Sequence, residues 1–218
     1  MIRPFGPSDI LIIAEAIRWT IALSAIAFAG GAIGGLLIAL ARTADTRWLR
    51  TAASLFIRLF QGTPLLMQLF LVFFGLNIFG LPINPWLAAS FALTLHASAF
   101  LGEIWRGSIE AIPPGQREAA TALGLRYYDR MTSVILPQAA RISVAPTVGF
   151  LVQLIKGTSL ASIIGFTELT RTGQIINNAT FSPFAVFGTV AAFYFILCWP
   201  LSLAAKRMEL RFARATTR

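Results

Sequence analysis

The fold is decided by an uncharged run, WTIALSAIAFAGGAIGGLLIALA, which extends from Trp19 to Ala41. About 20 such residues are enough for a helix to cross the hydrocarbon core of a bilayer, so the run predicts a membrane-spanning helix. It is too long for the apolar segment of a cleaved signal peptide, and we interpret it as a retained span. Two overlapping GxxxG pairs inside it, formed by Gly30, Gly31, Gly34 and Gly35, predict close approach by a second helix.

Two further long runs lack Asp, Glu, Lys and Arg: Leu59 to Gly102 and Thr172 to Ala205. The first must fold back, because residues 77–85 (NIFGLPINP) concentrate the Gly, Pro and Asn typical of a turn. With 56% hydrophobic and 12% charged residues, the chain reads as one all-α membrane domain over residues 1–218. The predicted spans are residues 19–41, 60–79, 85–104, 142–164 and 184–205, with a polar loop at 106–133.

The basic residues give these spans an orientation. They concentrate in residues 42–58, 106–141 and 206–218, whereas 77–85 has none and 167–183 has only Arg171. Short cytoplasmic loops carry the excess of Lys and Arg, so we expect the N-terminus outside and the C-terminus in the cytoplasm. The net charge of +9 flanks apolar runs and forms no single basic surface, which argues against a nucleic-acid partner.

The polar loop contains a short helix, predicted from Gln116 to Leu123. A Pro-Pro pair precedes it and Gly124 follows, the residue best suited to a left-handed helix cap. Ala119, Ala120 and Leu123 are predicted to share one small, smooth face that a partner protein could bind. A plain amphipathic connector lying on the membrane is the alternative.

Glu118-Ala119-Ala120, Gly124 and Ile135-Leu136-Pro137 together resemble the EAA loop of ABC importer permeases, the element that docks into the ATP-binding subunit. Other blocks resemble the polar amino-acid permease family, which includes histidine and glutamine transporters. These blocks are Gln61–Leu66 with Gln68, Gly102–Gly107, Leu136–Ala139 and Lys156–Leu160. The chain departs from the family at Gly157, where many relatives have Asp, and at Gln61, where Arg is usual.

The resemblance implies a type I ABC importer permease fold in a bacterial inner membrane. It implies that Glu118, Ala119, Ala120, Leu123 and Gly124 couple the chain to a dimer of ATP-binding subunits. The other implied partners are a second permease chain, identical or homologous, an external or periplasmic solute-binding protein, and a polar amino acid as substrate. The sequence has no GxxxxGK[ST] phosphate loop, so ATP and Mg²⁺ are expected on the ATPase and no cofactor on this chain.

Polar side chains inside a span are costly unless they are paired, which makes them candidates for the substrate path. These candidates are Gln68, His96, Lys156, Thr158 and Ser159. Each has a structural alternative: Gln68 as a bond between helices, His96 as a neutral histidine bonded to a neighbour, and Lys156 reaching to the outer interface. Glu103 and Arg106 are spaced to pair with each other, and with Pro64 they are assigned a structural or gating role.

Two other classes of function are weighed against the permease. An ion-coupled secondary amino-acid carrier would use the intramembrane His and Lys but leave the EAA loop without a purpose. A membrane enzyme is disfavoured, because no set of His, Cys, Asp and Glu has metal-ligand spacing and no nucleophile has a plausible base. With no acidic residue in the middle of a span, neutral or acidic amino acids are expected to be carried better than arginine or lysine.

Overall fold

The computed structural model describes residues 3–216, and every regular element in that range is helical. In chain order the elements are α1 (Pro7–Thr43), α2 (Arg47–Gln61), α3 (Leu65–Phe70), η1 (Leu71–Gly75), α4 (Leu76–Ile78), α5 (Pro85–Glu110), α6 (Pro114–Ala122), α7 (Tyr127–Arg130), η2 (Met131–Ile135), α8 (Leu136–Gly157), η3 (Thr158–Ile164), α9 (Leu169–Thr180) and α10 (Pro183–Thr216).

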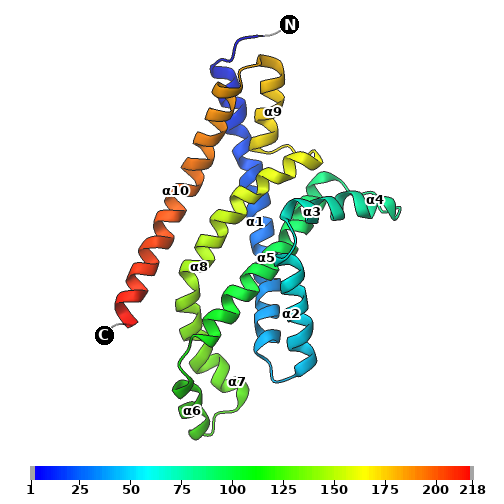
Figure 1. Ribbon diagram of the computed structural model, residues 1–218. Helices are drawn as coiled ribbons and strands as arrows, with labels where there is room; N and C mark the ends of the chain where they lie inside the picture. Colours follow the sequence, from blue (N-terminus) through cyan, green and yellow to red (C-terminus); the bar gives the residue numbers. More distant parts are fainter. Residues whose placement is uncertain (1–2, 217–218) are drawn as a thin grey trace.

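Four helical segments are long and apolar enough to cross a membrane: α1, α5, the continuous stretch Tyr127–Ile164, and α10. A fifth span results if α2 and the segment Leu65–Ile78, which meet at a bend of 102°, are counted together. The start of α1 and α9 lie at one end of the molecule, and α6 and α7 lie at the other (Figure 1). The all-α architecture with about five spans therefore agrees with the prediction.

The centre of the bundle is the contact between α1 and α5, which bury Leu23, Ala27, Ala92 and Ala97 together. The glycines of α1 make this contact possible. A Cβ added at Gly31 would overlap the Cβ of Ala97 and lie 3.2 Å from its carbonyl carbon. The close approach predicted from the GxxxG pairs is confirmed, and its partner is α5.

The first span is longer than predicted. Helix α1 begins at Pro7, not near Trp19, because Pro7 suits the first turn of a helix and Asp9 completes the start. The Asp9 carboxylate is buried, accepts a hydrogen bond from the Gly6 N–H at 3.0 Å and pairs with Arg3. Apolar periodicity could not reveal this extension, since the added turns carry charges.

The second span differs most from the prediction of a single helix at 60–79. The chain is already helical from Arg47, and it breaks at residues 62–64 before α3 begins. Pro64 has no N–H to donate and disfavours helical backbone at Thr63, so the two helices cannot join. Segments α3, η1 and α4 then project sideways from the other helices (Figure 1).

The fourth and fifth spans also exceed their predicted limits. The predicted range 142–164 lies inside the continuous segment Tyr127–Ile164, whose last turns are the 3₁₀ helix η3. Helix α8 ends at Gly157, and Pro146 inside it leaves the helix unbroken. Residues 169–180, predicted as a connection, form α9, and α10 continues beyond residue 205.

Replacing Gly31 by Ala tests the α1–α5 contact. We expect the substitution to lower the free energy of unfolding by about 1–3 kcal/mol, because the added methyl must displace the backbone of α5. Gly149→Ala on α8 is the matched control, since nothing lies within 4 Å of a Cβ there. Thermal melting of both purified variants in detergent is the measurement. Equal melting temperatures would contradict the proposed packing.

Candidate functional site

The short helix α6 is defined at both ends by its own sequence. Pro113 and Pro114 occupy the N-cap and first helical positions. At the other end Gly124 has φ of +75°, the left-handed region that glycine enters without strain. The N–H of Leu125 donates to the Ala120 carbonyl at 3.1 Å and that of Gly124 to Thr121 at 2.9 Å, which is the Schellman arrangement. The predicted helix and its glycine cap are confirmed.

The face that α6 offers to a partner differs from the prediction. Ala120 is only 3% exposed and packs toward the chain itself, whereas Leu123 is 80% exposed. Glu118 and Ala119 are also exposed. The expectation that Ala119, Ala120 and Leu123 form one free face is therefore wrong, because Ala120 attaches the helix to its own protein. Glu118, Ala119 and Leu123 remain free for contact.

Helix α6 is held against the ends of two spans by packing and by a hydrogen bond. Helix α6 contacts η2, whose buried Met131 and Ile135 pack with Ile109 at the end of α5 and with Ile112 just after it. Arg117 donates to the Ile109 carbonyl at 3.2 Å. A force on the exposed side of α6 would therefore reach α5 and α8 without passing through a flexible loop.

The predicted pair of Glu103 and Arg106 is present near this contact. The Arg106 guanidinium donates to both carboxylate oxygens of Glu103, from Nε at 2.9 Å and from Nη2 at 2.5 Å. It also bonds Glu110 one turn further along α5. With both acidic partners on its own helix, Arg106 stiffens the end of α5 and leaves little capacity to bind a ligand.

Gln68 holds the break in the second span. It is 5% exposed, and its Nε2 lies within hydrogen-bond distance of the Phe60 carbonyl (2.8 Å) and of the carbonyl and hydroxyl of Thr63 (3.0 and 2.9 Å). Its Oε1 accepts from Nδ1 of His96 on α5 at 3.1 Å. The amide satisfies the carbonyls that Pro64 leaves without helix partners. The structural alternative therefore accounts for Gln68 and for Nδ1 of His96.

The remaining candidates for the substrate path lie at the end of α8 and at the start of η3. Thr158 is fully buried and its hydroxyl donates to the Ile155 carbonyl at 2.7 Å, while Ser159 donates to the Lys156 carbonyl at 2.7 Å. Lys156 is exposed on the side of α8 where Ile155 packs with Cys198 of α10. These local bonds occupy the hydroxyls of Thr158 and Ser159, and Gln68, His96, Lys156, Thr158 and Ser159 stay candidates for the substrate path.

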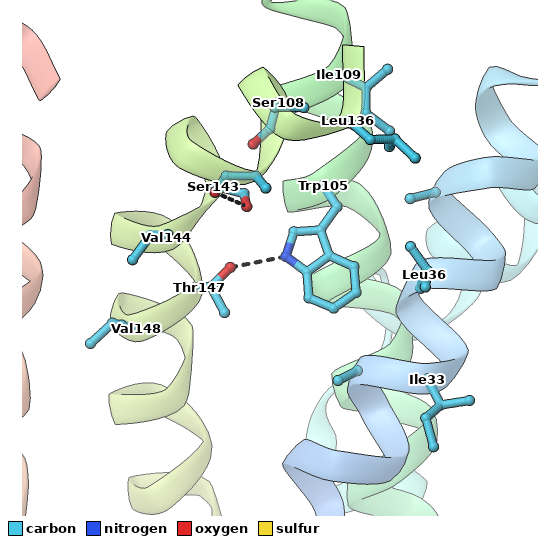
Figure 2. Close-up of a pocket in the computed structure, with 14 residues that line it drawn as sticks. Ile33, Leu36, Trp105, Ser108, Ile109, Leu136, Ser143, Val144, Thr147 and Val148 are labelled. Atoms are coloured by element: carbon cyan, nitrogen blue, oxygen red, sulfur yellow. Dashed lines mark hydrogen bonds between the residues drawn. The ribbon is translucent and has the colours of Figure 1, made fainter. Parts of the chain in front are cut away.

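A groove between α1, α5 and α8 has a cavity volume of about 620 Å³. Figure 2 shows Trp105 in this groove with its indole N–H directed at the Thr147 hydroxyl, 2.9 Å away. The hydroxyls of Ser108 and Ser143 also donate within the chain, to the carbonyls of Ile104 and Ala140. An amino-acid zwitterion would lose its hydration there without gaining partners, so the groove is unsuited to a polar substrate.

One polar cluster was not anticipated. Glu168, fully buried, caps α9 by accepting from the Arg171 N–H at 2.9 Å, and it accepts from the Tyr194 hydroxyl of α10 at 2.7 Å. Burial raises the pKa of this carboxyl, while its hydrogen bonds act in the opposite direction. The only signal in the sequence was a Glu at a helix start, which is an uncommon capping residue. Its tyrosine partner is 26 positions away in the chain, so local spacing could not indicate the pair. The cluster ties α9 to α10.

A bundle of membrane spans that carries a small, rigidly mounted helix at one end, with part of that helix free, defines the class: a membrane permease that is coupled to another subunit. The comparisons agree. The chain belongs to the family described as binding-protein-dependent transport system inner membrane component, whose model matches residues 31–218.

Relatives match over nearly the whole chain. The L-cystine transport system permease protein TcyB of Bacillus subtilis is 39% identical over 204 residues, 93% of this chain and 87% of that protein. The glutamine transport system permease protein GlnP of Escherichia coli is 36% identical over 202 residues, 92% of each.

Two solved structures share the fold. An amino acid ABC transporter crystallised with histidines has a TM-score of 0.86 and 34% identity, covering 92% of this chain and 94% of its own. The MetNI methionine ABC transporter has a TM-score of 0.77 and 23% identity, and the match covers 98% of this chain and 100% of that chain. This similarity supports the fold. The type I ABC importer permease architecture expected from the EAA loop is therefore confirmed.

Replacing Gln68 by Leu separates a structural role from substrate binding. The change leaves buried carbonyls of Phe60 and Thr63 without a donor, so we expect the free energy of unfolding to fall by about 1–3 kcal/mol. Uptake should fall by one common factor for every amino acid carried. Gln153→Leu, at an exposed position on α8, is the control for stability. A normal melting temperature with altered apparent KM for some substrates would show that Gln68 binds substrate.

Proposed function

We propose that this chain is the permease subunit of an ATP-driven importer of polar amino acids. The observation that carries the proposal is α6: its Ala120 is buried, it contacts η2 and it bonds the end of α5 through Arg117, while Leu123 is free at one end of the membrane bundle. The relatives TcyB and GlnP, named for L-cystine and glutamine transport, support amino acids as the substrate class.

In the proposed complex a dimer of ATP-binding subunits holds ATP and Mg²⁺ and performs hydrolysis, and this chain holds neither. Closure of that dimer would push on α6, and α5 and α8 would move with it because they pack in the same apolar cluster. A second permease chain, identical or homologous, completes the substrate path, and a solute-binding protein delivers the amino acid at the outer side. The motion alternates access between the two sides.

We place α6 and the C-terminus in the cytoplasm of a bacterial cell and the N-terminus outside. The Lys/Arg bias of the short connections supports this orientation, since the loop between α1 and α2 and the segment around α6 are basic while residues 77–85 are not. The ion-coupled carrier finds no support among the relatives, and it would leave the exposed side of α6 without a use.

For the substrate, neutral or acidic polar amino acids fit better than arginine or lysine. A cationic side chain would need a negative partner inside the membrane, and the acidic residues of α5, Glu103 and Glu110, are already paired with Arg106. This inference leaves the particular amino acid open. It also agrees with the Gly at position 157, where many relatives have Asp.

Replacing Leu123 by Glu tests the docking role of α6. Because the side chain is 80% exposed, we expect the isolated subunit to melt normally. In the complex a buried charge without a partner should weaken binding of the ATP-binding subunit by about 10-fold or more. The control is Leu81→Glu, also exposed but in the loop before α5. Copurification of the ATPase at wild-type levels with the Leu123 variant would contradict the proposal.

Reporter fusions test the orientation. We expect a reporter fused after Leu81 to be external and one fused after Gln116 to be cytoplasmic, because the charge bias orients the loops in that way. Paired alkaline phosphatase and fluorescent protein fusions at each position are the measurement. Both positions on one side of the membrane would contradict a five-span arrangement.

A further inference from the structure

Four arginines line one pocket between the end of α1 and an outward-facing side of α2. They are Arg42, Arg47, Arg50 and Arg58, and the pocket has a cavity volume of about 500 Å³. Thr51, Ser54 and Leu55 complete its walls. Along α2 the lining positions recur at three to four residues, so they form one face of that helix. Ala53 and Ile57, on the opposite face, are buried.

Within the part of the chain whose side chains are described, no carboxylate forms an ion pair with the guanidinium groups of this pocket; Glu103 attracts Arg42 electrostatically but is paired with Arg106. The ion pairs found there join Arg3 to Asp9 and Arg106 to Glu103 and Glu110. Nε of Arg42 is moreover buried and makes no hydrogen bond. Four cations that share a pocket repel one another, and an anion that enters it relieves the repulsion and supplies acceptors.

The depth of the pocket distinguishes it from an ordinary cluster of positive charges at the inner membrane surface. The Phe60 carbonyl is bonded to Gln68, which is bonded to His96 of α5. The neighbouring Ala97 abuts Gly31 of α1, close to the middle of the uncharged run. Phe60 therefore lies near the middle of the bilayer.

Arg58 precedes Phe60 by two residues, so along α2 it lies about 3 Å from the level of Phe60. Arg42, in contrast, lies about 16 Å along α1 from Gly31, which is at the same level as Phe60. Arg42, Arg47 and Arg50 fit the positive-inside pattern at the membrane surface, but Arg58 lies well inside the hydrocarbon region. An arginine at that depth must face water or a partner. A lipid headgroup at the inner surface is the alternative occupant, because Arg58 shares one pocket with the three surface arginines.

We propose that this face of α2 lines the inner half of the substrate path and that its arginines form a transient site for carboxylate groups. The inference rests on the proposed importer function and adds a charge preference to it. Rings of basic side chains select anions in membrane pores, and the same field would favour acidic amino acids and slow cationic ones. Arg58 is the residue that determines specificity at the deepest point.

A first experiment measures whether the pocket attracts anions, and it does not depend on transport activity. Ser54→Cys, in a Cys198→Ser background, places a thiol in the pocket wall. In reconstituted complexes we expect negatively charged methanethiosulfonate reagents to react faster than positively charged ones, and Arg58→Gln to reduce that ratio. One unit charge at about 6 Å in water changes a local ion concentration roughly 3-fold, so the ratio should fall roughly 10-fold.

A second experiment measures uptake of labelled glutamate, glutamine and arginine by the same complexes. We expect Arg58→Gln to lower the ratio of glutamate to arginine uptake several-fold, and to lower the ratio of glutamate to glutamine uptake by less, because glutamine still presents one carboxylate. The control is Arg126→Gln, which removes an exposed arginine that lies outside the pocket, in the loop before α7. This control should leave unchanged both the ratio of glutamate to arginine uptake and the ratio of the two reagent rates at Ser54→Cys.

The outcomes separate the two proposals. If no amino acid is taken up while Ser54→Cys shows the anion preference, the importer function fails and the anion-attracting arginine pocket stands. Equal reactivity toward both reagents, or an unchanged glutamate to arginine ratio in Arg58→Gln, would overturn the carboxylate site. A thiol that reacts only after anionic phospholipid is omitted would also overturn it, and would assign the pocket to a lipid headgroup.

Discussion

The close contact between α1 and α5 positions the other parts of this protein. Lipid chains are as apolar as leucine side chains, so helices in a bilayer associate through close packing, which small residues permit. Gly31 and Gly35 bring α1 against Ala97 and Leu101 of α5. Helix α5 then contacts the break in the second span near its middle, through His96, and holds α6 at its C-terminal end, through the Ile109 carbonyl.

The break at residues 62–64 shows how a backbone that is not helical is tolerated at membrane depth. Carbonyls without partners are expensive in hydrocarbon, and here the Gln68 amide satisfies those of Phe60 and Thr63 while His96 fixes the amide. An amide that seemed suited to a substrate is therefore used by the fold. The same break divides the span into α2, with its polar face, and the projecting segment from α3 to α4.

The helix proposed to bind the ATPase, α6, and the arginine-lined face of α2 are separate parts of the chain. Helix α6 is attached through Ala120 and presents Leu123, so a partner can move α5 and α8 together. The arginine-lined face of α2 shares no residue with the apolar cluster of Ile109, Ile112, Met131 and Ile135. The proposed coupling and the proposed charge selection therefore occupy different elements.

The sequence by itself determined the membrane class, the close approach at the α1 glycines, the capped helix that ends at Gly124, and the family, because these depend on local runs and short spacings. Tertiary structure decided which face of α6 is free, where Gln68 makes its bonds, and that Glu168 meets Tyr194. These depend on helix phase against neighbours and on pairing between distant residues, which periodicity does not contain. The depth that we infer for Arg58 likewise depends on the contact of the second span with α5 through Gln68 and His96.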